Sequence, residues 1–229
     1  MKITWLGQAG FLFETANKKI LIDPYLSESC LELNPDCYRR MPVDEKFFDI
    51  TPDVIVLTHS HLDHTDPETL KHYLGKMGEI TVLASPLAWD IVRKYGNGHN
   101  YVRFDRHTEW SEGDVRFSAV KAEHSDPSAI GIIIEADGKK YYHTGDTLYN
   151  SDIFTDIPDD VYATFAVVNG KGNNMNISDA ERFAKKVGSK YFIPMHWGLH
   201  DELYPDTLNS SGLIIPEIYK EICFEEETR

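Results

Sequence analysis

The hydrophobic positions of this chain fall into short runs, each of strand length and each bounded by turn residues. In the first half, these runs predict strands at residues 2–6, 11–15, 19–23, 53–58 and 80–84. In the second half, they predict strands at residues 115–122, 130–136, 140–144, 162–168 and 190–195. Several runs, such as DVIVLT, are apolar without interruption, which is typical of strands buried on both faces.

Helical patterns follow some of these strands. They predict helices from Asp66-Pro67 onward, over residues 86–96 and over residues 177–188. In the last of these, Ser178 and Glu181 predict a capping box. Residues 27–52 show no clear period and are predicted to form a loop. Because no linker rich in Pro, Gly or Ser divides the chain, we expect two packed sheets with helices outside, in one domain over residues 1–229.

Composition narrows the range of partners. The formal net charge of −14, without a basic patch, argues against nucleic acid as a partner. The N-terminus lacks the apolar core of a signal peptide, and no window reaches the length of a membrane helix. The three cysteines are an odd number without a CxxC pair, which is typical of free thiols in a reducing compartment. We therefore expect a cytoplasmic protein that acts on a small molecule, with no membrane contact, and self-association is left open.

The most distinctive stretch is THSHLDHTD, which places three histidines and two aspartates at residues 58–66. It directly follows a predicted buried strand, so its side chains lie at a sheet edge. His59 and His61 point to the same side if the backbone is extended. Asp63 and His64 come as the chain turns and can face a second point nearby. Four donors on one tight loop do not easily enclose a single tetrahedral ion, but they can begin two adjacent metal sites.

Three further donors follow other predicted strands in the same way. They are His124, Asp146 and His196. His200 lies four residues after His196 and is the one further histidine that could line a pocket. Ordinary surface or supporting roles are predicted for His72, His99, His107 and His143.

These motifs resemble those of the metallo-β-lactamase superfamily. THSHLDH has the form HxHxDH, and His124, Asp146 and His196 match the remaining metal motifs in order and rough spacing. The segments WLGQAGFLFE, LIDPYLSESC, VVNGKGNNMN and IPMHWG are similar to the branch that contains L-ascorbate-6-phosphate lactonase. This likeness covers most of residues 1–200. The chain departs from the lactonase around Lys171-Gly172-Asn173, where its loop is shorter, so the substrate does not follow from the likeness.

The resemblance implies an α/β (α+β) fold, a four-layer αββα sandwich of two mixed sheets flanked by helices, with the site at one sheet edge. It implies two divalent ions, Zn²⁺ or Mn²⁺. It assigns His59, His61 and His124 to one ion and Asp63, His64 and His196 to the other. Asp146 would bridge them. Five imidazoles and two carboxylates are compatible with either metal.

Two adjacent dications can share a water molecule and hold it as hydroxide near neutral pH, so no serine or cysteine nucleophile is needed. Asp63 could also accept the proton from this water. We therefore expect a metal-dependent hydrolase of a small lactone or ester, with a phosphorylated sugar lactone included. Its substrate contacts are predicted at Asn169, Asn173, Asn176 and His200. A phosphodiesterase on a small cyclic or aryl phosphodiester, and a metal-binding or sensor protein without catalysis, remain alternatives.

Overall fold

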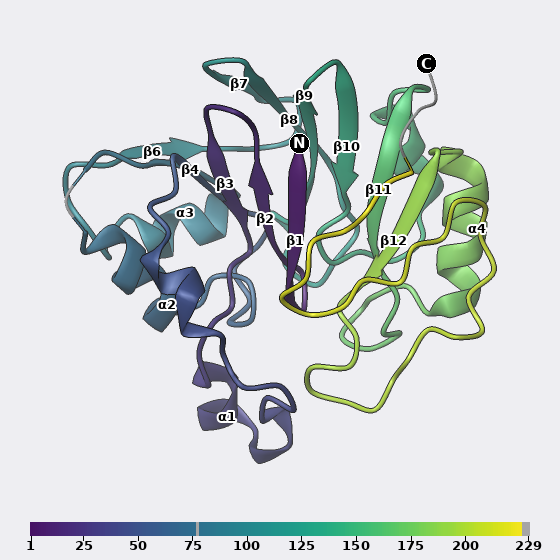
Figure 1. Cartoon of the computed structure of the whole chain (residues 1–229), viewed down its shortest axis with the longest axis horizontal. Coiled ribbons are helices and arrows are strands. Elements are labelled where there is room, and N and C mark those ends of the chain that lie inside the picture. Colours follow the sequence, from purple (N-terminus) through teal and green to yellow (C-terminus); the bar gives the residue numbers. More distant parts are fainter. Residues whose placement is uncertain (77, 226–229) are drawn as a thin grey trace.

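Two six-stranded β-sheets pack face to face in the computed structural model, which describes residues 1–76 and 78–225 (Figure 1). The first sheet has the order β1 (Lys2–Gly7), β2 (Gly10–Glu14), β3 (Lys19–Ile22), β4 (Val54–Leu57), β5 (Thr81–Ala84) and β6 (Asn100–Arg103). The second has the order β12 (Tyr191–Met195), β11 (Val161–Val167), β10 (Lys139–His143), β9 (Ile130–Ala136), β8 (Val115–Lys121) and β7 (Glu109–Glu112).

Both sheets are mixed, and the parallel part of each sheet brings the C-terminal ends of its strands to one edge. In the first sheet, β1 to β3 pair antiparallel, and β3 to β6 pair parallel. In the second, β7 to β10 pair antiparallel, and β10 to β12 pair parallel. Parallel neighbours deliver the residues that follow them to the same edge of a sheet, and this is where α/β proteins place their sites.

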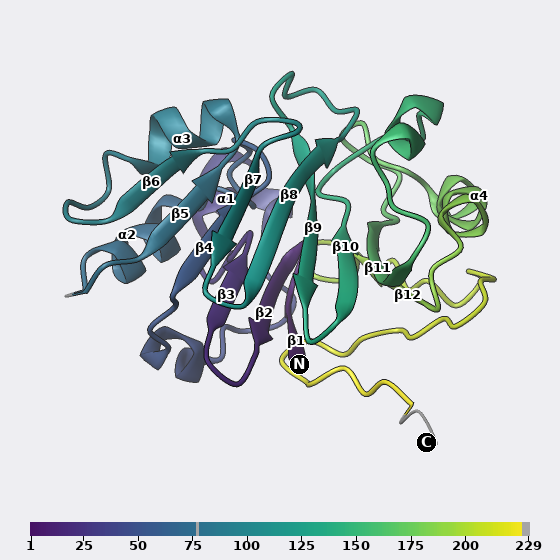
Figure 2. The ribbon, with the colours of Figure 1, turned by 90° about the horizontal axis from the view of Figure 1, so that it is seen from above.

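Helices cover the two outer faces, so the molecule has the four layers of an αββα sandwich, as predicted. Leucine, tyrosine and alanine side chains of α2 (Pro67–Leu74) and α3 (Pro86–Val92) pack with the outward-facing residues of β4 and β5. The apolar face of α4 (Ile177–Val187) packs beside β11 on the second sheet, and the short 3₁₀ helix η3 (Ser151–Thr155) contacts β8. In Figure 2, α2 and α3 lie at the left beside the first sheet, and α4 lies at the right beside β11 and β12.

The predicted loop at residues 27–52 is partly helical. It contains α1 (Ser29–Leu33) and the 3₁₀ helices η1 (Pro35–Cys37) and η2 (Glu45–Asp49). In Figure 1, α1 stands apart from the two sheets. Strands β6 and β7 were not predicted, because their residues are mostly polar and only partly buried, and so lack a strong period.

The predicted capping box of α4 is wrong. The cap is Asn176, whose side chain accepts a hydrogen bond from the backbone N–H of Asp179 at 2.9 Å, and Ser178 lies inside the first turn. Glu181 instead accepts from the backbone N–H of Asn209 at 2.8 Å. Asn176 and Ser178 can both cap a helix. Asn176 becomes the cap because its backbone is extended, whereas Ser178 already lies in the helix.

Gly188 ends α4 in the left-handed conformation, with φ of 68°. A Cβ atom at this position would meet no atom within 4 Å, so only backbone strain opposes a side chain. We expect Gly188→Ala to lower the free energy of unfolding by about 1–2 kcal/mol. Gly188→Asn should lose less, because asparagine tolerates this conformation. Urea unfolding of the three proteins measures this, and equal midpoints for Gly and Ala would contradict it.

The C-terminal segment covers the open edges of β1 and β12. Tyr219 and Ile222 donate backbone hydrogen bonds to the carbonyls of Trp5 and Ile3 at 2.7 and 2.8 Å, and Ile214 donates to Phe192 at 2.9 Å. These bonds satisfy strand edges that would otherwise stay unpaired. Among the described residues, no helix is long and apolar enough to cross a membrane.

Candidate metal centre

The seven predicted metal ligands lie at the end of the sandwich where β4, β8, β10 and β12 finish. They form two groups. One donor atom from each of His59, His61 and His124 lies within 4.8 Å of the others, and the same holds for Asp63, His64 and His196. The ring nitrogens Nε2 of His124 and Nδ1 of His61 are 3.1 Å apart. His64 and His196, which are 132 positions apart in the sequence, therefore converge here.

Asp146 lies between the two groups. Its Oδ1 is 3.4 Å from Nε2 of His64, and its Oδ2 is 3.4 Å from Nε2 of His196 and 4.0 Å from Nε2 of His124. Asn174 donates a hydrogen bond to Oδ2 at 2.8 Å. Oδ1 is buried and has no hydrogen-bond partner among the described residues. This carboxylate therefore reaches both groups and keeps one oxygen free for an ion.

The imidazole rings are held so that their remaining nitrogens face the centre. Nδ1 of His59 lies 3.1 Å from Thr58 Oγ1, and Nδ1 of His124 lies 3.2 Å from the carbonyl of Asn173. A carbonyl only accepts, so His124 carries its proton on Nδ1 and presents the lone pair of Nε2. Nε2 of His59 is buried without a partner among the described residues. Such nitrogens fit a metal ion, which would satisfy them.

Asp23 is a part of the centre that the sequence did not reveal. It is fully buried and accepts hydrogen bonds from the backbone N–H of Thr58 at 2.8 Å and from its hydroxyl at 2.5 Å. It also lies 2.8 Å from Nδ1 of His64, which leaves Nε2 of that ring free for the centre. Asp23 is the last residue of the predicted strand at residues 19–23 and directly follows the observed β3, so its position at a strand end was the available signal.

Gln8 is the second such residue. Its Nε2 donates to Asp63 Oδ2 at 3.0 Å, and its backbone carbonyl accepts from the N–H of His196 at 2.9 Å. Both Gln8 and His196 adopt positive φ angles, of 47° and 64°. The turn after β1 and the end of β12 are thus bonded together, and this orients a carboxylate and an imidazole toward the same point.

The ionisation of the centre indicates that it needs positive charge. Burial, together with the neighbouring His64, lowers the pKa of His59. Burial also opposes protonation of His64, but the carboxylates of Asp146 and Asp63 outweigh it and raise the pKa of His64 well above its usual value. Against the effect of burial, His196 and His64 hold the pKa of Asp146 well below its usual range. A bound cation would replace the positive charge that these imidazoles otherwise carry.

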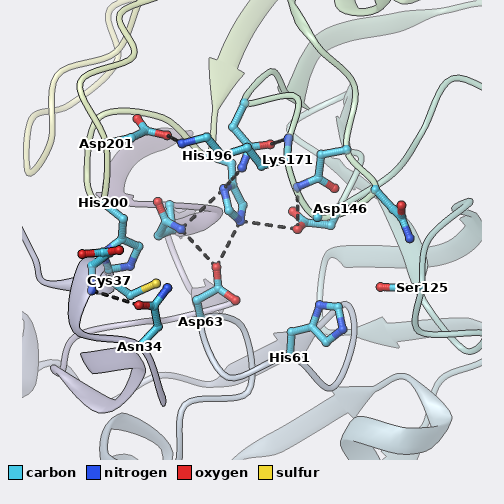
Figure 3. A pocket seen from close by; sticks show the side chains of 16 residues that line it. Asn34, Cys37, His61, Asp63, Ser125, Asp146, Lys171, His196, His200 and Asp201 are labelled. Carbon is cyan, nitrogen blue, oxygen red and sulfur yellow. Dashed lines mark hydrogen bonds and ion pairs between the residues drawn. The ribbon is translucent and has the colours of Figure 1, made fainter. Parts of the chain in front are cut away.

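A cavity of about 590 Å³ opens beside the centre (Figure 3). Asp63, His61, Asp146 and His196 form part of its wall. Of the residues predicted to contact substrate, three line it: Asn169, Asn173 and His200. Asn176 does not, because its side chain caps α4 instead. Sequence reasoning did not assign a substrate role to other residues of the wall, namely Gln8, Asn34, Asp36, Cys37, Ser125 and Asp201.

The remaining histidines have other partners. His143 is buried, lies 2.9 Å from the carbonyl of Ala9 through Nε2 and accepts from the N–H of Gly145 at 3.1 Å, so it supports the turn that carries Asp146. The other three histidines contact groups that are not predicted ligands. His72 and His99 lie within hydrogen-bond distance of the backbone carbonyls of Phe48 and Leu74, and His107 lies within hydrogen-bond distance of the carboxylate of Asp156.

Comparison with known proteins agrees with the fold and the motifs. A family model described as a β-lactamase superfamily domain matches residues 2–196. The chain belongs to the metallo-β-lactamase superfamily. A UPF0173 protein of Pyrococcus furiosus is 30% identical over 208 residues, which cover 90% of this chain and 88% of the relative. A UPF0173 metal-dependent hydrolase of Staphylococcus aureus is 29% identical over 212 residues, 86% of each chain.

Solved structures of other proteins share the fold over nearly the whole chain. Igni18, a metallo hydrolase of Ignicoccus hospitalis, superimposes with a TM-score of 0.76 at 19% identity, covering 99% of both chains. An isothiocyanate hydrolase from Delia radicum gut bacteria gives a TM-score of 0.71 at 20% identity, covering 98% of this chain and 99% of that one. At these identities the likeness establishes the fold only.

Proposed function

We propose that this member of the metallo-β-lactamase superfamily is a metal-dependent hydrolase that opens small lactones or esters. The observation that carries the proposal is the pair of three-donor groups on either side of Asp146, beside an open cavity. The name of the Staphylococcus aureus relative, a metal-dependent hydrolase, supports the general class of reaction.

The proposed ligands form two sites. His59, His61 and His124 would hold one ion, and Asp63, His64 and His196 would hold the other. Asp146 would be shared. Five imidazoles and two carboxylates suit Zn²⁺ or Mn²⁺. Nε2 of His59 and Oδ1 of Asp146 support this assignment, since each of these buried atoms has no hydrogen-bond partner among the described residues.

When bound, two dications would lower the pKa of a water molecule and polarise the carbonyl oxygen of the substrate. The protein's own groups then position the reactants. Asp63 faces the cavity, and its carboxylate, held by Gln8, can accept the proton of the attacking water. Asn169 and Asn173 are neutral groups of the wall that can hydrogen-bond the oxygens of the substrate.

A lactone or ester is favoured over a phosphodiester by three observations. The net charge of −14 repels polyanions. The wall carries the amides Asn169, Asn173 and Asn174, which suit sugar-like oxygens. The sequence segments that resemble the ascorbate-6-phosphate lactonase branch favour a carbonyl substrate.

The proposal is tested by a panel of lactones, carboxylic esters, cyclic nucleotides and aryl phosphodiesters, with Zn²⁺ or Mn²⁺ restored. We expect the highest kcat/KM for a lactone or ester, and loss of activity with a chelator. His107→Ala is a suitable control, because this exposed histidine bonds to Asp156 outside the centre. If kcat/KM for a phosphodiester exceeds that for every lactone and ester by more than about tenfold, or roughly 1.4 kcal/mol, the function is phosphodiester hydrolysis instead.

A further inference from the structure

We propose that the outer part of the cavity binds an uncharged, hydroxyl-bearing end of the substrate and discriminates against a phosphate there. This proposal rests on the hydrolase function above and deepens it, because it names the class of substrate. The proposal depends on two properties of the cavity wall. The first is its charge, and the second is that its polar atoms without a hydrogen-bond partner are acceptors.

The charge of the outer wall does not suit an anion. Among the described residues that line the cavity, Lys171 is the single lysine or arginine. Its ammonium is 3.2 Å from Oδ2 of Asp201, and Oδ1 of that carboxylate accepts from the backbone N–H groups of Gly198 and Leu203, each at 3.1 Å. Figure 3 shows this ion pair at the rim, with His200 beside Asp201. Asp36 adds a second carboxylate to the wall. A phosphate there would meet two carboxylates and a cation that is already paired.

His200 offers the first unpartnered atom. Its Nδ1 lies 3.1 Å from the backbone carbonyl of Tyr38. Since a carbonyl cannot donate, the ring carries its proton on Nδ1, and Nε2 is a lone-pair acceptor. Nε2 is buried and has no partner among the described residues. Burial also lowers the pKa of His200, which keeps the ring neutral.

Asn174 provides the second atom without a hydrogen-bond partner. Its Nδ2 must be the atom that faces Asp146 Oδ2 at 2.8 Å, because a carboxylate only accepts. The amide orientation is therefore set, and the opposite atom, Oδ1, is an acceptor that is buried without a partner among the described residues. Asn174 also lines the cavity, beside Asp146 at the inner end of the outer wall, and is only 6% exposed.

Both unpartnered atoms are acceptors, so a ligand that satisfies them has to bring donors. Sugar-like hydroxyls donate, whereas a phosphate dianion has only acceptor oxygens. A buried acceptor left without a donor weakens binding, so the same wall that favours hydroxyls disfavours phosphate. The charge and the hydrogen-bonding capacity of the wall therefore agree.

The first test compares a neutral polyhydroxylated lactone with the same lactone phosphorylated on its terminal hydroxyl, using the metal-loaded enzyme. We expect kcat/KM to favour the neutral member by about tenfold or more. Asp201→Asn removes one negative charge and keeps an oxygen for the N–H groups of Gly198 and Leu203, so it should lower this ratio several-fold. A wild-type ratio at or below one, with Lys171→Gln further disfavouring the phosphorylated member, overturns the proposal.

The second test compares the neutral lactone with deoxy analogues that lack single hydroxyls. The wild-type enzyme should prefer the hydroxylated form by about tenfold at one position at least. His200→Phe should abolish a preference that depends on Nε2, and His200→Gln, which provides an amide oxygen, should restore part of it. Equal rates for the hydroxylated and every deoxy substrate in the wild-type enzyme overturn the proposal.

Both tests remain decisive if the lactone function itself is wrong. If the panel shows that another substrate class is hydrolysed best, neutral, phosphorylated and deoxy members of that class are compared in the same way. The selectivity of the outer wall can then be upheld while lactone hydrolysis is rejected, or the reverse.

Discussion

Replacing Asp146 with asparagine should lower kcat/KM by at least about 100-fold and weaken the binding of both metal ions. The carboxylate of Asp146 lies between the two donor groups, with Oδ1 near His64 and Oδ2 near His196 and His124. Bound metal ions contribute several kcal/mol to the charge stabilisation of such a reaction, so weaker binding of both ions accounts for a loss of this size. Asparagine keeps the shape of the side chain but removes its charge.

Elemental analysis of the purified, reloaded protein measures the metal content directly. We expect about two equivalents per chain in the wild type and loss from both sites in Asp146→Asn. His196→Ala is the matched comparison, because His196 belongs to one donor group only, and it should lose about one equivalent. Saturation of the wild type at one equivalent, with His196→Ala unchanged, would contradict the two-site arrangement.

Asp23→Ala should lower the free energy of unfolding of the metal-free protein by about 3–5 kcal/mol, because three buried hydrogen-bond donors would lose their acceptor. These donors are the N–H and hydroxyl of Thr58 and the ring of His64, at 2.8, 2.5 and 2.8 Å. The metal affinity should fall about 10- to 100-fold as well, since His64 loses the group that orients it. Asp23→Asn should be milder, because its amide oxygen can still accept from part of this set.

Denaturant unfolding without metal separates the effect on stability from the effect on metal binding. The control is Asp156→Ala. Asp156 is a largely buried carboxylate with partners on Arg106, His107 and Lys121, away from the centre. This variant should lose stability but keep the metal affinity of the wild type. If Asp23→Ala binds metal as tightly as Asp156→Ala does, Asp23 has no role in orienting His64.

The strands and the ligand loop were predictable because their signals are local. The runs that form β4 and β12 are continuously apolar, as expected for strands that are buried on both faces. By contrast, β6 and β7 alternate weakly and are half exposed, so a local pattern could not identify them. At α4, Asn176 and Ser178 are both good caps, and the choice between them depends on the path by which the chain enters the helix.

The sequence by itself determined ten of the twelve strands of the described residues, the superfamily motifs and the identity of seven metal-ligand candidates, because a donor that follows an apolar strand is visible in its own neighbourhood. Only the tertiary structure decided that Asp146 lies between the two groups, that Asp23 and Gln8 hold His64 and Asp63, and that the free atoms of the outer wall are acceptors. The reason is physical. Asp23 is 41 positions from His64 and Gln8 is 55 from Asp63, and a hydrogen bond over such a separation exists only when the strand order of the first sheet brings its partners to the same edge.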